Sequence, residues 1–259
     1  MIRSGDLHEA SDWIARGIAG TQAKLPGIAA ELRKTQCELW EKEGDWLRVA
    51  AVRAEEFLDM PAFLSYRRLE DAARASGIWD EMKGVVRQFL VTGKIPGERR
   101  GGQDNEGKLF GVLPCSGLFP QGSKRKHGSP FPGILIDIAI AENKPDEVLI
   151  WYDTIRGMSG TWGRFDPPDD KVANCIAEQF PDRALTIWME KAEKYAAESR
   201  PKSYEAAVGY LGKIGALMKD QGREAEWDDY MTRTRNTNAR KKRFLEMLDV
   251  LEGKKILDS

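Results

Sequence analysis

Residues 44–79, GDWLRVAAVRAEEFLDMPAFLSYRRLEDAARASGIW, show the structural unit that the rest of the chain repeats. Gly44 and Gly77 each end an amphipathic run where glycine serves as a helix C-cap, and a tryptophan two positions later begins the next run. The two glycines are 33 residues apart. A period near 33–34 residues is typical of stacked helix pairs. Because one pair cannot bury its apolar face alone, the pattern predicts neighbouring pairs that share a continuous core.

Five amphipathic runs fill residues 1–93. If Gly44 and Gly77 are the turns between the two helices of a pair, the first helix of the chain is the second member of its pair. We therefore expect its partner upstream of Met1, with a degenerate N-terminal cap as the alternative. Pro61 is expected at the first position of the fourth helix, where its missing N–H would be unpaired anyway. The expected helices run from Asp6 to Gly20, Pro26 to Gly44, Trp46 to Leu58, Pro61 to Gly77 and from Trp79 onward.

The runs resemble tetratricopeptide repeats when they are aligned on the glycines. Tyr66 and Leu69 then occupy two large apolar positions, Trp40 occupies a third, and Pro61 stands at the closing proline. The small residues usual in that motif are present only in part. The resemblance implies an all-α fold, a right-handed superhelical stack of antiparallel helix pairs.

Residues 94–133 interrupt the periodicity. They contain nine Gly and five Pro, a composition that buries too little apolar surface to offset the entropy of ordering. We expect a flexible insertion, pinned in part by Leu109-Phe110, Leu113 and Leu118-Phe119. An insertion of this length is either functional or disordered.

The helical pattern resumes at 134–252, which we expect to continue the same stack, with a tail at 253–259. The apolar run 135–140 fits a buried strand or a helix, and a turn at Asn143, twice the period after Gly77, favours helix. Glycines 209, 212 and 215 lie inside one expected helix and are tolerable there if they allow close approach of a neighbour.

Composition excludes several classes of protein. Forty Lys and Arg oppose 41 Asp and Glu, so no overall field favours nucleic acid or a membrane. No apolar run approaches about 18 residues and no secretory signal follows Met1, which predicts a cytoplasmic protein without membrane attachment. Three widely spaced cysteines do not form a disulfide framework.

Four later segments recur in a recognisable order, preceded by residues 44–69: 181–185, 204–207, 222–227 and 240–245. Their order is similar to that of the C-terminal helical region of bacterial SWIM zinc-finger proteins. That resemblance implies a TPR-like appendage of a longer protein whose zinc finger lies upstream. The family's C-x-C…C-x-H zinc pattern is absent, since Cys37, Cys115 and Cys175 are isolated, so no metal role is carried over.

Few residues suggest a site, and none forms a catalytic or cofactor-binding signature. Cys115 and His127 share a loop without the rigid scaffold that a nucleophilic pair needs. Trp162 and Phe165 lie among glycines and prolines in an expected loop, where exposed aromatics can anchor a protein partner. Two basic runs are candidates for phosphate contact: residues 124–127, and the set Arg233, Arg235, Arg240, Lys241, Lys242 and Arg243.

These features favour a non-enzymatic interaction module or scaffold that binds a protein or peptide partner. Stacked helix pairs expose an extended surface, and repeat proteins use it to hold partners. The alternative is a nucleic-acid accessory module that uses the basic runs 124–127 and 233–243.

Overall fold

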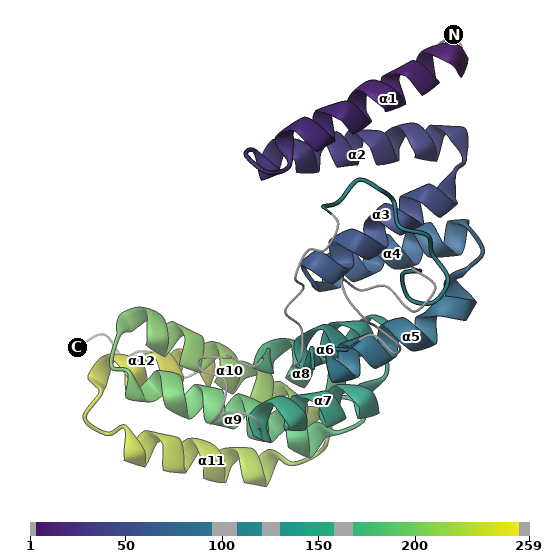
Figure 1. Ribbon diagram of the computed structural model, residues 1–259. Coiled ribbons are helices and arrows are strands. Elements are labelled where there is room, and N and C mark those ends of the chain that lie inside the picture. The colour runs from purple at the N-terminus through teal and green to yellow at the C-terminus, as the bar shows by residue number, and fades with distance from the viewer. Residues whose placement is uncertain (1–3, 95–107, 121–129, 158–167, 254–259) are drawn as a thin grey trace. The chain divides into compact units, whose positions relative to one another are not determined.

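The computed structural model describes residues 4–94, 108–120, 130–157 and 168–253 (Figure 1). Over these ranges the protein is all-α, with one isolated bridge between Leu109 and Leu113, and its helices pack as neighbours in sequence, which confirms the predicted class. The chain divides into two compact units, Met1–Ile138 and Ala139–Ser259. The helices are α1 (Ser4–Thr21), α2 (Pro26–Glu43), α3 (Trp46–Asp59), α4 (Phe63–Ala75), α5 (Trp79–Thr92), α6 (Pro132–Ala141), α7 (Pro145–Gly157), α8 (Asp169–Ile176), α9 (Pro181–Ala197), α10 (Pro201–Asp220), α11 (Glu224–Thr237) and α12 (Lys242–Leu251).

The predicted helix ends are confirmed where left-handed residues stand. Gly44 has φ +76° and Gly77 has φ +79°, a conformation that glycine adopts without a steric penalty. Asn143, the turn residue that favoured helix over strand at 135–140, has φ 53° between α6 and α7. Gly44, Gly77 and Asn143 therefore lie in turns where the sequence predicts them.

The predicted start of the fourth helix at Pro61 is wrong, because α4 begins at Phe63. Ala62 is extended (φ −150°, ψ 157°) and serves as N-cap. The Ser65 hydroxyl accepts from the Ala62 N–H at 3.1 Å and lies 3.0 Å from the Met60 carbonyl oxygen. These contacts fold the chain back around Pro61 and place the proline in the turn.

The helices of unit 1 pair differently from the prediction. With Gly44 and Gly77 as the turns within pairs, the predicted pairs are α2 with α3 and α4 with α5. In unit 1 the most extensive packing joins α1 to α2 and α3 to α4, whereas the contact between α4 and α5 is much less extensive. α1 therefore has α2 as its packing partner. Both kinds of turn, within a pair and between pairs, are only a few residues long, so the spacing of glycines does not distinguish them.

The core of unit 1 is aromatic. The Phe57 ring lies 6.2 Å from Tyr66 and 5.7 Å from Phe89 between ring centroids, both in edge-to-face geometry. Phe131, just before α6, packs 5.3 Å from Phe89. Such aromatic pairs add to the hydrophobic stabilisation of α3, α4 and α5.

Part of the predicted insertion belongs to this core. Leu109, Phe110 and Leu113 are fully buried, which confirms the predicted pinning of the segment. The Phe110 ring lies 6.2 Å from Phe57 and 6.1 Å from Phe89. The remainder of 94–133 that was expected to be flexible falls mostly on 95–107 and 121–129, outside the described residues.

A buried carboxylate fixes the second half of the same segment. Glu55 of α3 is only 6 % exposed and accepts from the Ser116 N–H at 3.2 Å and from the Ser116 hydroxyl. Arg33 of α2 lies over the Phe119 ring, 4.3 Å from its centroid. Residues 108–120 therefore bridge α2, α3 and α5 by polar as well as apolar contacts.

In unit 2, α10 packs against α9, α11 and α12. A Cβ added to Gly215 of α10 would lie 3.0 Å from the Trp227 ring of α11, which confirms the predicted close approach at this glycine. The prediction is wrong for Gly209, where a Cβ would meet nothing within 4 Å, and for Gly212, where it would make only an ordinary 3.7 Å contact with Leu251. Tyr204 of α10 packs 5.2 Å from Phe244 of α12. Through these contacts α11 and α12 pack on α10. Helix α10 thus has α9 and α11 as neighbours on either side.

Candidate functional site

A groove runs between α9 and α11 in unit 2, over α10. It consists of two hollows of about 440 Å³ and 260 Å³, and Tyr230 and Arg233 line both of them. Leu211 and Met218 of α10 line one hollow each. The first hollow is also lined by Ala192, Glu193, Ala196, Ala197, Thr234, Thr237, Asn238, Lys241 and Phe244, and the second by Asp182, Leu185, Thr186, Met189, Arg223, Glu226 and Asp229.

Helical spacing explains why these residues meet. On α11, Glu226, Tyr230, Arg233 and Thr237 recur every three or four positions and therefore share one face. The residues that α9 contributes follow the same spacing from Asp182 onward. The beginnings of both helices line the smaller hollow and their ends line the larger one, so α9 and α11 run in the same direction (Figure 1).

The charge of the groove changes along its length. Asp182, Glu226 and Asp229 stand at the end where the two helices begin, and Arg223 bridges Asp182 and Glu226 at 2.7 Å each. Arg233 lies one helical turn beyond Asp229, toward the larger hollow. Carboxylates are stabilised at helix N-termini and cations at C-termini, which favours this order of charges.

The Tyr230 side chain carries the most unusual polar group in the groove. It is 6 % exposed, and its hydroxyl makes no hydrogen bond of good geometry with the described residues, because the neighbouring Thr234 hydroxyl donates to the Tyr230 carbonyl oxygen at 2.9 Å. Burial, with the nearby negative charge of Glu193, raises the pKa of Tyr230 to about 12. The hydroxyl is therefore neutral at pH 7 and has a proton to donate. Buried polar groups of native proteins normally have partners, so this exception in the wall of an open groove makes the groove a candidate binding site.

Two members of the predicted basic run 233–243 are used in the fold. Arg235 pairs with Asp249 at 2.8 Å and with Glu252 at 2.5 Å, both near the end of α12. The Lys241 ammonium donates to the Ala196 carbonyl at 2.7 Å and to Asn238 Oδ1 at 2.8 Å. Lys241 thus caps the C-terminus of α9, where carbonyl groups lack partners within the helix.

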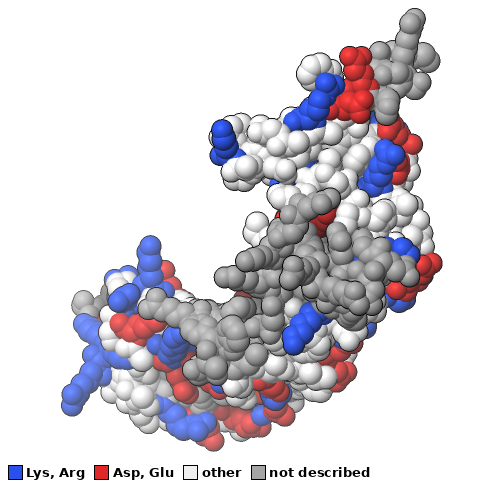
Figure 2. All heavy atoms as spheres, viewed as in Figure 1, with Lys and Arg blue, Asp and Glu red and all other residues white. Residues whose placement is uncertain are grey.

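The other four members of the run are available to a ligand. Arg233, Arg240, Lys242 and Arg243 are exposed and form no ion pair with the described part of the chain. Figure 2 shows basic side chains projecting from the end of unit 2 where α11 turns into α12. The basic run 233–243 therefore contains two residues that stabilise the fold and four that are free to contact a ligand.

Several predicted site residues lie outside the described residues. Trp162 and Phe165 fall in 158–167, and the basic run 124–127, with His127, falls in 121–129. Cys115 is half-buried in the docked segment of unit 1. Their roles stay predictions.

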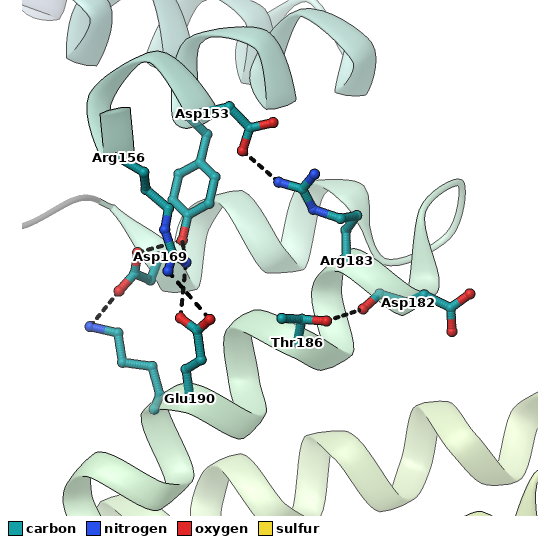
Figure 3. Close-up of polar contacts among 9 residues, drawn as sticks. Asp153, Arg156, Asp169, Asp182, Arg183, Thr186 and Glu190 are labelled. Carbon is teal, nitrogen blue, oxygen red and sulfur yellow. Dashed lines mark hydrogen bonds and ion pairs between the residues drawn. The ribbon is translucent and has the colours of Figure 1, made fainter. Parts of the chain in front are cut away.

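A cluster of ionisable groups joins α7, α8 and α9 (Figure 3). The buried Tyr152 hydroxyl donates to Asp169 at 2.8 Å, and Lys191 pairs with the same carboxylate at 2.6 Å. Arg156 forms a two-pronged pair with Glu190 at 2.9 and 3.3 Å. Burial and the hydrogen bond to Asp169 raise the pKa of Tyr152 to about 12. Each group in this cluster has a partner, so the cluster aligns the helices.

Unit 1 also has a hollow between alternate helices, in this case the second members of its pairs. About 430 Å³ in volume, it lies between α2 and α4 with Arg53 and Glu56 of α3 beneath it. Its lining is almost entirely charged, and Arg53 pairs with Glu56 at 2.8 Å. The same arrangement, two alternate helices with a third between them, thus occurs in both units.

No group of three or more His, Cys, Asp or Glu side chains in the described ranges is placed to hold a metal ion. Among the described helices, none has the length and apolar character needed to cross a membrane. No family model, curated protein or solved structure matches the chain.

Proposed function

We propose that the protein is a non-enzymatic interaction or scaffold module built of tetratricopeptide-like helix pairs, and that it binds an extended segment of a protein partner. The observation that carries the proposal is the α9–α11 groove, with the buried, unpartnered Tyr230 hydroxyl in its wall. Repeat proteins bind partners on the surface formed by alternate helices of the stack.

The regular placement of the hollows supports the solenoid part of the proposal. A hollow lies between α2 and α4 and another between α9 and α11, each across the intervening helix. The hollow of unit 1 lies between second members of pairs and the groove of unit 2 lies next to α9, the first member of the α9–α10 pair, so each is a gap between successive equivalent helices of a stack of pairs. Ridges and gaps at regular intervals suit an extended chain better than a compact small molecule.

The chemistry of the ionisable groups supports a binding role over catalysis. General acid–base catalysts have pKa values near the working pH, whereas burial raises the pKa of Tyr152 and of Tyr230 to about 12. The α7–α9 cluster is occupied by its own ion pairs. We propose binding without covalent chemistry.

We also propose, on the resemblance of the motifs at 181–185 and 222–227, that the module is part of a SWIM-type zinc-finger protein. A C-x-C…C-x-H segment encoded in the reading frame upstream of Met1 is the expected finding. An upstream frame that encodes a different domain would contradict this parentage.

The interaction role is tested with a phage-displayed random heptapeptide library selected on the purified protein. Selected peptides should slow hydrogen exchange in α9 and α11, and Thr186→Trp, which fills the groove, should abolish binding. Thr232→Trp is the matched control, because Thr232 is exposed on α11 and does not line the groove. Failure to select any peptide that protects these helices would refute the proposed function.

A second candidate, nucleic-acid binding, is favoured by the four exposed cations without ion pairs, Arg233, Arg240, Lys242 and Arg243. Titration with duplex and single-stranded DNA at two salt concentrations tests it, because each neutralised phosphate steepens the salt dependence. Charge reversal at Arg240, Lys242 and Arg243 should remove the binding. Absence of binding at low salt removes this candidate.

A further inference from the structure

The order of charges in the α9–α11 groove specifies what kind of segment fits it. Glu226 and Arg233 are seven residues apart on α11, which corresponds to about 10 Å along the helix. A segment in the extended polyproline II conformation advances about 3.1 Å per residue and has three residues per turn, so three residues span this distance and bring the side chains back to the same face. Side chains of opposite charge three positions apart on a peptide therefore match the two ends.

The basic end of the groove offers a complete set of donors for a carboxylate. The Tyr230 hydroxyl is buried, neutral and without a partner, and the exposed Arg233 guanidinium lines the same two hollows. A carboxylate oxygen accepts well from a hydroxyl and from a guanidinium, and hydrogen bonds to a charged group are about twice as strong as neutral ones. An acidic side chain would satisfy the hydroxyl that the fold leaves unpaired.

We propose that the groove binds an extended peptide segment with an acidic residue on Tyr230 and Arg233 and a basic residue three positions away, facing Asp182 and Glu226. The inference rests on the proposed function and names the chemistry of its partner. The groove follows α9 from Asp182 to Ala197, about 22 Å, which about seven extended residues span.

The acidic end of the groove decides between a peptide and a nucleic acid. A nucleic-acid strand carries a negative charge at every phosphate, and three carboxylates at one end of the groove would repel it. Glu193 adds a further carboxylate near the basic end. A segment of mixed charge meets both ends favourably, so the groove favours a peptide.

The test uses the heptapeptides selected from the library, resynthesised with a fluorescent label and titrated by anisotropy into the full chain. Enriched sequences should contain an acidic and a basic residue three positions apart, in either order. Arg233→Ala should weaken binding about tenfold, since a charged hydrogen bond is lost. Arg243→Ala, an exposed cation outside the groove, should change the affinity less than twofold.

Tyr230→Phe separates binding from a structural role. Because the hydroxyl makes no hydrogen bond in the free protein, its removal should leave the melting temperature unchanged or raise it while weakening the peptide several-fold. Glu193→Gln should strengthen binding, because it removes a repulsive charge. A Tyr230→Phe variant that binds like the wild type would overturn the assignment.

Failures of the two proposals are distinguishable. Peptides that protect α9 and α11 but lack the acidic residue, or that bind Arg233→Ala unchanged, overturn this inference and leave the interaction module standing. Equal weakening by Arg233→Ala and Arg243→Ala, or displacement of the peptide by single-stranded DNA, points to general cation-driven binding and also overturns it. The absence of any peptide that protects the groove removes both.

Discussion

Phe110→Ala tests whether the segment 108–120 is part of the core of unit 1. Phe110 is fully buried, and its ring lies 6.2 Å from Phe57 of α3 and 6.1 Å from Phe89 of α5. Truncation removes the ring from a packed aromatic cluster and leaves a cavity bounded by both helices. If the segment were only laid over a complete core, the change would release the segment and leave the helices intact.

The expected cost follows from the burial. Replacing a fully buried Phe by Ala destabilises a protein by about 3–5 kcal/mol, the sum of lost transfer free energy and of the cavity. Every 1.4 kcal/mol is a factor of about ten, so opening equilibria in unit 1 should rise by about a hundredfold or more. Val112→Ala is the matched control in the same segment, because Val112 is half-buried and should cost less than about 1 kcal/mol.

Hydrogen exchange followed by mass spectrometry measures the effect locally. Peptides from α3 and α5 should exchange faster in Phe110→Ala by the factor above, while peptides from α9 and α10, in unit 2, serve as the internal reference. Accelerated exchange confined to 108–120, with α3 and α5 unchanged, would refute the view that this segment completes the core.

Three further predictions concern single groups. Lys241→Met should destabilise unit 2 by about 1–2 kcal/mol and accelerate exchange at the end of α9, because the carbonyl of Ala196 loses its donor, whereas the exposed Lys242→Met should be nearly neutral. Burial raises the pKa of the Cys37 thiol from 9.0 to about 11, so the folded protein keeps a proton that the unfolded chain loses. Stability to urea should therefore fall as the pH rises from 9 toward 11 and should fall less in Cys37→Ala; equal pH dependence in both proteins would contradict this. Gly44→Ala should destabilise by about 1–2 kcal/mol through its φ of +76°, whereas Gly84→Ala in the exposed middle of α5 should stabilise by about 0.8–1 kcal/mol, both measured by denaturant unfolding.

The fold was predictable from the sequence as far as local signals reach. Helical spacing and left-handed turn residues such as Gly44 and Asn143 are properties of a few neighbouring positions, and they set the helices and turns correctly. The choice of partner for each helix is not local. The turn at Gly44 and the turn after Met60 are both short, and only the packing of the folded helices shows that α3 pairs with α4. The sequence therefore predicts the helices better than their pairing.

The insertion at 94–133 shows that average composition and individual residues can predict different structures for one segment. The average composition of 94–133 predicts only a flexible segment, whereas the individual apolar residues Leu109 and Phe110 predict the pinning that the structure confirms, with the Phe110 ring packed against Phe57 of α3 and Phe89 of α5. A segment without periodic structure can supply core side chains when its neighbours cannot close the core themselves.

The basic run 233–243 explains why the candidate site was only half predictable. Charge and spacing are all that the sequence displays, and by these Arg233 and Arg235 are equivalent. In the helix, a separation of two residues turns side chains about 200° apart, so Arg233 enters the groove while Arg235 faces α12 and its carboxylates. Tyr230, three positions before Arg233, belongs to no motif in the sequence. Its hydroxyl lacks a partner because of the way α9 and α11 pack, which the sequence does not display. The candidate site depends on a hydroxyl without a hydrogen-bond partner, and whether a partner is present depends on how the neighbouring helices pack. Tyr230→Phe and Arg233→Ala therefore test the function more directly than deletion of the whole basic run 233–243.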